Sequence, residues 1–382
     1  MRLPGLHSRR GQAGWIAGAA VVVLALFVWV APYNIAARLP HLPGVSWLLH
    51  TYMQNAVRTW SLGTEAPDWY DEDDPALVRL GAGHFETGCA PCHGAPGRPP
   101  NPVTRGMRPA PPPLDEPAAD YAPRELHWIV RNGFKYTGMP AWPSADREDE
   151  LWALVAFLRD YPALDAEDYA ALAYGPSAPP DLNAARRITF GGLNDRLDEL
   201  TDTCARCHGE DGLGREGTAP RLAGQSQAYM EETLDAYASG LRPSGIMEPV
   251  AATLSQAEIA QLAEHYAGLP AGPAAPADPD RDALITEGAA LAKLGDAERP
   301  SCLSCHGEGG EVRRNPLFPR IAGQDERFLL VWLRLWRDRP FGGTPYAQVM
   351  HEAARWLTDA QTEALAAYFS TLDPESRSDP AE

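Results

Sequence analysis

The sequence predicts an all-α protein in which three consecutive helical domains follow an N-terminal transmembrane helix. A long uncharged apolar run near the N-terminus predicts the transmembrane helix. A pentapeptide containing cysteine and histidine occurs three times, which predicts one fold repeated along the chain. Near the end of each repeat, apolar residues recur at spacings of three and four, as on one face of a helix, and no segment alternates as a β-strand does.

The apolar run "WIAGAAVVVLALFVWV" covers residues 15–30, inside an uncharged segment that covers residues 11–37. About 20 mostly apolar residues span a bilayer. Arg2, Arg9 and Arg10 precede the run, which places the N-terminus in the cytoplasm and the rest of the chain in the periplasm. A cleaved signal peptide is the alternative, but its apolar core is usually shorter, and no small-x-small site with alanine at both ends follows the run. We therefore expect a single-pass anchor in the inner membrane.

Aromatic residues follow the anchor in residues 38–74, among them Trp47, Tyr52, Trp60 and Trp69. Tryptophan and tyrosine are enriched where a membrane meets water. This segment is expected to lie near the lipid headgroups as an interfacial linker, and a plain extended linker is the alternative.

The charge of the chain is distributed unevenly. The first forty residues hold four arginines and no acid, so the remaining residues carry −18 − 4 = −22. An acidic surface repels nucleic-acid phosphates and attracts basic protein patches. The charge therefore predicts a cationic protein partner and argues against binding of nucleic acid. The alternative is that the acidic side chains serve only to keep the protein soluble.

The second and third repeats match at slowly growing offsets. Cys207 matches Cys305 at 98 residues, "APRLAGQ" matches "FPRIAGQ" at 99, and Met247 matches Met350 at 103. Such offsets indicate one fold with small loop insertions. The Pro-rich stretches "AYGPSAPPD" and "LPAGPAAPADPD" read as linkers between the units.

Each repeat is expected to end in an amphipathic helix. Ser255 with Glu258, and Thr358 with Gln361, have the spacing of capping boxes. The apolar face lies 12, 15, 19 and 22 residues after a methionine. Its members are Leu151, Leu154, Leu158 and Tyr161; Ile259, Leu262, Tyr266 and Leu269; and Thr362, Leu365, Phe369 and Leu372. A further helix is expected before the first pentapeptide, in "DPALVRLGAGHFETG".

All six cysteines lie in the three pentapeptides: Cys89, Cys92 and His93; Cys204, Cys207 and His208; and Cys302, Cys305 and His306. Cys-x-x-Cys-His is the attachment motif of c-type haem, in which two thiols bind the vinyl groups and the histidine binds the iron. A zinc site needs four suitably spaced ligands, and a thioredoxin-like motif needs a βαβ context. Neither pattern is present, so the sequence predicts three covalently bound haems.

Methionine is a frequent sixth ligand where haem iron transfers electrons. One methionine follows each pentapeptide histidine: Met139 after 46 residues, Met247 after 39 and Met350 after 44. Met107 is a weaker alternative to Met139, and His351 competes with its neighbour. The constant distance to the terminal helix favours Met350, which would leave His351 facing solvent or a haem edge. Met230 is assigned to the core.

The other ring nitrogen of each haem-binding histidine needs an acceptor, which fixes the ring and tunes the metal. The carbonyls of Pro220 and Pro319 are the expected acceptors in the second and third units. In the first unit the acceptor is expected within residues 109–113. Three further histidines on predicted helices are assigned to packing or to the surface: His84, His127 and His265.

These segments resemble class I cytochromes c. Residues 184–373 resemble the dihaem cytochromes c of bacterial respiratory chains through "CARCHGEDG", "PRLAGQ", "IMEPVAATLS" and their counterparts in the third unit. Residues 75–162 resemble a single-haem domain through "ELHWIVRNGFKYTGMPAW". The resemblance implies three consecutive all-helical haem domains, iron bound by histidine and methionine, and electron transfer without substrate chemistry. Lys135 and Lys293 are the only lysines, so docking through a lysine ring is not expected.

The expected organisation follows: 1–37 cytoplasmic tip and anchor, 38–74 interfacial linker, 75–162 first domain, 163–183 linker, 184–270 second domain, 271–280 linker, 281–373 third domain and 374–382 tail.

The expected function is a membrane-anchored trihaem cytochrome c, not itself an enzyme, that relays single electrons in the periplasm. Its donor would be a quinol-oxidising complex or a dehydrogenase, and its acceptor a terminal oxidase or a cationic cytochrome. The alternatives are the cytochrome subunit of an alcohol or sugar-acid dehydrogenase, or a dihaem-type peroxidase, which needs a haem with an open ligand position.

Overall fold

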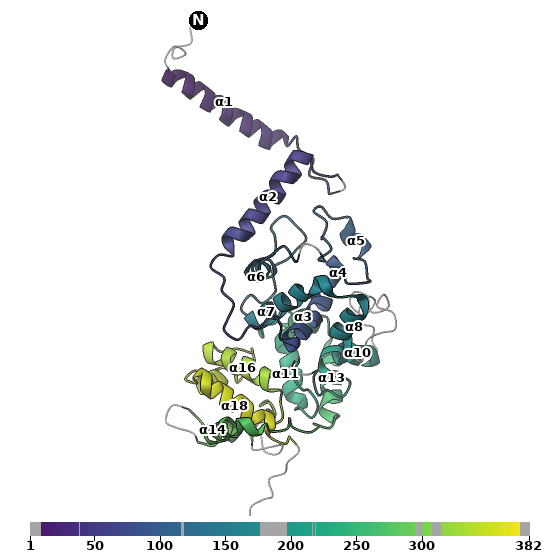
Figure 1. Ribbon diagram of the computed structural model, residues 1–382, viewed down its shortest axis with the longest axis vertical. Coiled ribbons are helices and arrows are strands. Elements are labelled where there is room, and N and C mark those ends of the chain that lie inside the picture. The colour runs from purple at the N-terminus through teal and green to yellow at the C-terminus, as the bar shows by residue number, and fades with distance from the viewer. Residues whose placement is uncertain are drawn as a thin grey trace, which may run out of the picture.

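The computed structural model describes residues 9–37, 39–115, 118–175, 197–215, 217, 219–294, 299–307 and 315–374 (Figure 1). These residues form helices joined by loops, and the part of the chain they cover contains no strand beyond an isolated bridge between Ala95 and Arg98. The predicted all-α class is confirmed.

Two N-terminal helices project from the helical body: α1 (Arg9–Val30) and α2 (Pro43–Trp60) (Figure 1). The Gln12–Val30 stretch of α1 has a mean hydropathy of 2.3, none of it is buried, and it is long and apolar enough to cross a membrane. It thus has the length and composition predicted for the transmembrane helix. The C-terminal part of α2 contacts the helical body. Val57 of α2 is fully buried, and α2 packs against α6 (Pro123–Asn132).

The first helical unit is built around α3 (Pro75–Gly88), which packs along α7 (Glu148–Asp160) and α8 (Ala166–Tyr174). Asp74 caps the start of α3 by accepting a hydrogen bond from the Ala76 amide at 2.9 Å. A Cβ atom on Gly81 would lie 2.0 Å from the Ala153 carbonyl oxygen, so only glycine allows α3 and α7 to cross this closely. Besides α6, the remaining helices of this unit are α4 (Ala90–His93), α5 (Pro102–Arg105) and η1 (Tyr161–Ala163).

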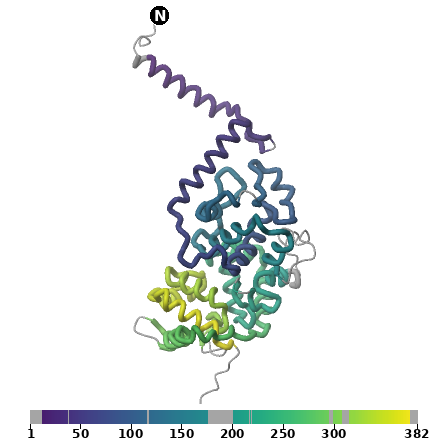
Figure 2. The backbone as a smooth tube through the Cα atoms, in the orientation of Figure 1, coloured from purple at the N-terminus to yellow at the C-terminus, as the bar shows by residue number. Residues whose placement is uncertain are grey.

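The second and third units follow in teal and in green to yellow (Figure 2). The second contains α10 (Leu197–His208), α11 (Gln227–Ala238), α12 (Met247–Ala251) and α13 (Gln256–Gly268). The third contains η3 (Pro279–Arg281), α14 (Asp282–Lys293), α15 (Leu303–His306), α16 (Glu326–Asp338), α17 (Ala347–Ala354) and α18 (Asp359–Thr371).

The third unit repeats the close helix crossing of the first. A Cβ atom on Gly288 of α14 would lie 2.0 Å from the carbonyl oxygen of Ala364 in α18. Ala364 lies 14 residues after Met350, as Ala153 lies 14 residues after Met139. The two units therefore share one fold and one register relative to their methionines.

The terminal helices confirm the predicted caps and faces. Both capping boxes are formed, at the start of α13 and of α18. Of the twelve face positions, all are buried except Leu269 and Leu372. These two are the C-cap residues of α13 and α18, so the helical face ends before it reaches them. Of the predicted linker 163–183, residues 163–175 are described and include the helix α8, and residues 176–183 lie outside the described residues.

Candidate functional site

The three pentapeptide histidines each donate a hydrogen bond from Nδ1 to a prolyl carbonyl. The acceptors for His208 and His306 are Pro220, at 2.9 Å, and Pro319, at 3.0 Å, as predicted. In the first unit the acceptor for His93 is the Pro112 carbonyl, at 2.8 Å, within the predicted range. A carbonyl only accepts, so Nδ1 carries the proton and Nε2 is the nitrogen left for a metal.

Burial lowers the pKa of His93, His208 and His306, which favours the neutral imidazole that binds metals. Burial also raises the pKa of the Cys89 and Cys204 thiols to about 12. In the described residues, no three histidine, cysteine, aspartate or glutamate side chains gather as ligands of one metal ion.

A glycine directly after each histidine follows the last residue of the helix that carries the pentapeptide. Gly94, Gly209 and Gly307 have φ of 77°, 81° and 81°, the left-handed region that glycine adopts without strain. At Gly94 a Cβ atom would also lie 2.8 Å from the Arg98 carbonyl oxygen. The glycine after each pentapeptide is therefore part of the motif, because its left-handed conformation turns the backbone directly after the histidine.

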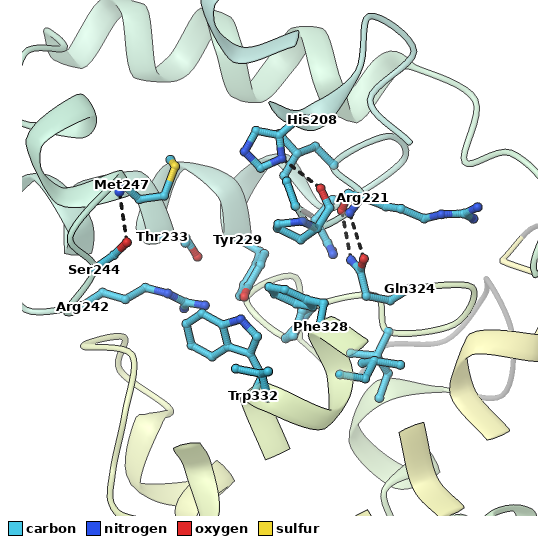
Figure 3. Close-up of a pocket in the computed structure, with 18 of the residues that line it drawn as sticks. His208, Arg221, Tyr229, Thr233, Arg242, Ser244, Met247, Gln324, Phe328 and Trp332 are labelled. Atoms are coloured by element: carbon cyan, nitrogen blue, oxygen red, sulfur yellow. Dashed lines mark hydrogen bonds between the residues drawn. The ribbon is translucent and has the colours of Figure 1, made fainter. Parts of the chain in front are cut away.

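One cavity, of about 420 Å³, joins the second and third sites. It is lined mainly by apolar atoms, and its lining includes all the predicted haem-binding residues of both units: Cys204, Cys207, His208 and Met247, and Cys302, Cys305, His306 and Met350. Protein interiors are normally close-packed, so an apolar space of this size is typical of a bound group. Figure 3 shows the His208 ring and the Met247 thioether facing the same space. The donor set and the cavity fit covalently attached haem.

The methionines are held by their backbones. Met247 begins α12, and its amide donates to Ser244 Oγ at 3.0 Å. Met350 lies within α17 and lines the cavity, whereas the neighbouring His351 donates from Nδ1 to the Trp336 carbonyl at 2.8 Å. The His351 ring, which we expected to face solvent or a haem edge, is half-buried and bonded to the backbone of α16.

The two candidates for the first methionine come from different loops, Met107 from the loop after α5 and Met139 from the loop between α6 and α7. The Met139 amide donates to Thr137 Oγ1 at 3.1 Å, and its carbonyl accepts from the Phe134 amide at 3.1 Å. The methyl group of Met107 lies against Gly138, where a Cβ atom would be 1.9 Å away. The structure thus brings Met107 beside Met139.

The other histidines pack, as predicted. His127 is buried, its ring stacks on Trp152 at 4.5 Å, and Nε2 lies 2.7 Å from Glu148. His84 is buried near Trp142, with 6.1 Å between ring centroids, and His265 is half-buried. Met230 is part of the second unit's core, as predicted.

Glu150 of α7 forms a junction between the first and second units. Its buried carboxylate accepts from Ser244 Oγ at 2.6 Å and from the Gly245 amide at 2.7 Å. Within its own unit it accepts from Trp142 Nε1 at 2.9 Å and pairs with Arg147 at 3.0 Å. Sequence reasoning missed this junction, because Glu150 and Ser244 are 94 residues apart and neither belongs to a recognisable pattern.

Two glutamines join the second and third units. Gln225 and Gln324 end the repeated segments "APRLAGQ" and "FPRIAGQ", and each bonds the backbone of the other unit. The repeated segment draws attention to these two glutamines in the sequence, but it does not indicate which groups they bond.

Comparisons with known proteins agree with this geometry. Residues 76–158 match the family model described as cytochrome c oxidase, cbb3-type, subunit III, and residues 199–267 and 285–373 match the model described as cytochrome c. The thiosulfate dehydrogenase electron acceptor of Thiomonas intermedia is 36% identical over 172 residues, which are 44% of this chain and 77% of that relative. The chain belongs to the class I c-type cytochromes.

Two further relatives of this cytochrome are similar over comparable lengths. The thiosulfate dehydrogenase electron acceptor of Stutzerimonas stutzeri is 37% identical over 48% of this chain and 83% of the relative. Cytochrome c4 of Thiocapsa roseopersicina is 32% identical over 44% of this chain and 86% of the relative. This multihaem cytochrome binds haem covalently at its three pentapeptides, transfers electrons and exchanges them with redox protein partners.

Proposed function

We propose that this cytochrome is anchored in the inner membrane by α1 and relays single electrons through three haem domains on the periplasmic side. The observation that supports the proposal most is the cavity shared by the second and third units, because the predicted haem-binding residues of both units line it. The first unit is included in the relay because its histidine is bonded to a prolyl carbonyl, as are the histidines of the second and third units.

The iron ligands we propose are His93 with Met139, His208 with Met247, and His306 with Met350. Haem iron supplies reversible one-electron chemistry, and a thioether ligand raises its reduction potential. The chain's own residues orient the imidazoles through prolyl carbonyls and enclose the second and third sites in apolar side chains. Residues 75–162, 184–270 and 281–373 are the three proposed domains.

The anchor proposal rests on α1 and α2 together. Exposed large apolar side chains continue from α1 into α2, where Trp47 is 69% exposed and Tyr52 is 73% exposed. A helix with such side chains beside a membrane span is typical of the interface between lipid and water. We propose that α2 lies against the headgroups and holds the first domain near the membrane.

The proposed donor is a periplasmic dehydrogenase. Two relatives are named electron acceptors of thiosulfate dehydrogenase, which favours a thiosulfate-oxidising donor over an alcohol or sugar-acid dehydrogenase or a quinol-oxidising complex. The proposed acceptor is a terminal oxidase or a cationic cytochrome, because the body of the chain carries an excess of acid.

The experiment uses the full chain purified in detergent. Stopped-flow absorbance follows its reduction by thiosulfate dehydrogenase with thiosulfate, and its reoxidation by a membrane fraction that contains terminal oxidase. We expect all three haems to be reduced and reoxidised, without turnover of hydrogen peroxide. Peroxide turnover would instead identify a peroxidase, and reduction by other dehydrogenases but not by this one would remove thiosulfate from the proposal.

A further inference from the structure

The second and third units exchange a reciprocal pair of glutamine contacts. Gln324 of the third unit accepts from the Arg221 amide at 2.8 Å and donates to the Arg221 carbonyl at 3.1 Å (Figure 3). Gln225 of the second unit accepts from the Arg320 amide at 2.7 Å and donates to the Arg320 carbonyl at 3.0 Å. Both glutamines are buried, with 6% and 8% of their surface exposed for Gln324 and Gln225. The interface therefore repeats one contact in both directions.

Each contact ends on the peptide group that holds a haem-binding histidine. The Arg221 amide and the Pro220 carbonyl belong to the same peptide bond, and that carbonyl accepts from His208. A continuous chain therefore runs from His208 Nδ1–H through this peptide group to Gln324 Oε1.

The opposite chain has the same form. It runs from His306 Nδ1–H through the Pro319–Arg320 peptide group to Gln225 Oε1. Each haem-binding histidine thus ends a hydrogen-bonded chain that begins in the other domain.

Such a chain affects the electronic character of the histidine. Hydrogen bonds in series polarise one another, so an amide that donates to glutamine becomes a better acceptor at its carbonyl. A stronger acceptor at Nδ1 makes the imidazole a more electron-rich ligand. An electron-rich ligand stabilises ferric over ferrous iron, and this lowers the reduction potential.

We propose that Gln324 sets the reduction potential of the haem bound by His208, and that Gln225 sets that of the haem bound by His306. The two glutamines are positioning residues, because they act through a peptide group and do not touch the haem-binding atoms. The proposal rests on the proposed ligation by His208 and His306, and it goes further by assigning control of each haem to the opposite domain. Loss of both glutamine contacts therefore shifts both potentials, and loss of one contact shifts one potential.

The test measures reduction potentials in the full chain by spectroelectrochemistry. The variants are Gln324→Leu and Gln225→Leu, which remove the amide while keeping a side chain of similar size. Each haem gives one reduction step in this titration. The step of the second haem is the one that Met247→Ala shifts, and the step of the third haem is the one that Met350→Ala shifts. If neither methionine variant moves any step, the proposed ligation fails before the glutamines are tested.

Ser226→Ala is the matched control. Ser226 Oγ donates across the same interface to the Pro316 carbonyl at 2.5 Å, but that peptide group does not hold a histidine. Its loss removes one side-chain hydrogen bond between the units and leaves both histidine chains intact.

We expect Gln324→Leu to raise the potential of the second haem and Gln225→Leu to raise that of the third. In a chain of hydrogen bonds, the energy of each bond increases by about 10–30%. A change of this size corresponds to about a threefold change in the equilibrium between ferric and ferrous haem. At 59 mV per tenfold change, this is a shift of about 30 mV. The proposal is overturned if each variant moves the haem of its own domain, if neither potential moves, or if Ser226→Ala produces the same shifts.

Discussion

Replacing Glu150 with glutamine should loosen the junction between the first and second domains. The glutamine keeps the length and shape of the side chain. Its amide nitrogen can only donate, and every partner of the Glu150 carboxylate is itself a donor: the Trp142 indole, the Ser244 hydroxyl, the Gly245 amide and the Arg147 guanidinium. At least one buried donor is therefore left without an acceptor.

The size of the effect follows from the burial of this carboxylate. The Glu150 side chain is 3% exposed, and removing one partner of a buried ion pair costs about 3–5 kcal/mol. Arg147 keeps its second carboxylate partner, Asp149, at 2.7 Å. The expected loss is therefore at the lower end of this range, about 3 kcal/mol in the free energy of unfolding.

Two measurements on the detergent-solubilised chain check this prediction. Calorimetry reports the loss of stability, and near-infrared absorption of the ferric protein reports the bond between sulfur and iron. The second measurement should change too, because Ser244 bonds both Glu150 and the Met247 amide. We expect a weakened band from one of the three haems.

Glu125→Gln is the control. Glu125 is also buried in the first domain, where its carboxylate accepts from the Ala122 amide at the start of α6. Glutamine serves equally well in a capping box, so the expected change is within about 0.5 kcal/mol. Equal stability and equal spectra for Glu150→Gln and Glu125→Gln would refute the reasoning about the junction.

Other changes test the ligands, the surface charge and the anchor. Met350→Ala should remove one third of the near-infrared band while His351→Ala leaves it intact, because the His351 ring is bonded to the Trp336 carbonyl; the reverse result would make His351 the ligand. Electron transfer to a cationic cytochrome should slow as salt rises, because screening weakens attraction to the acidic body, and a rate independent of salt would assign the acid to solubility. The chain should stay with membranes in high salt and leave them in detergent, because burial of α1 in lipid is apolar and is not screened; a mature N-terminus beyond residue 31 would contradict this.

Local patterns were sufficient to predict much of the fold. The faces of the terminal helices were readable because burial along a helix follows its period, and residues such as Leu154, Leu262 and Leu365 are buried as expected. The acceptors Pro220 and Pro319 were found through the repeat. These features depend on neighbours in the sequence or on comparison between repeats.

Contacts between the domains were not predictable from one sequence. Glu150 and Ser244 meet only because two folded units pack together, and nothing near either residue indicates the other. Within the first unit, the carbonyls of the Pro-rich loop look alike in sequence, so only the folded loop identifies Pro112 as the acceptor for His93. His351 is held by a carbonyl 15 residues earlier, on α16, which the pattern around Met350 does not reveal.

The most direct test of the account is a reductive titration of the purified full chain, followed by acid-acetone extraction of the same sample. We predict that three electrons are taken up per chain, that each ferric haem shows the near-infrared band of a sulfur ligand, and that all haem colour stays with the protein. The account would be contradicted by uptake of fewer than three electrons, by a haem that binds carbon monoxide at an open position, or by haem that is extracted into the solvent.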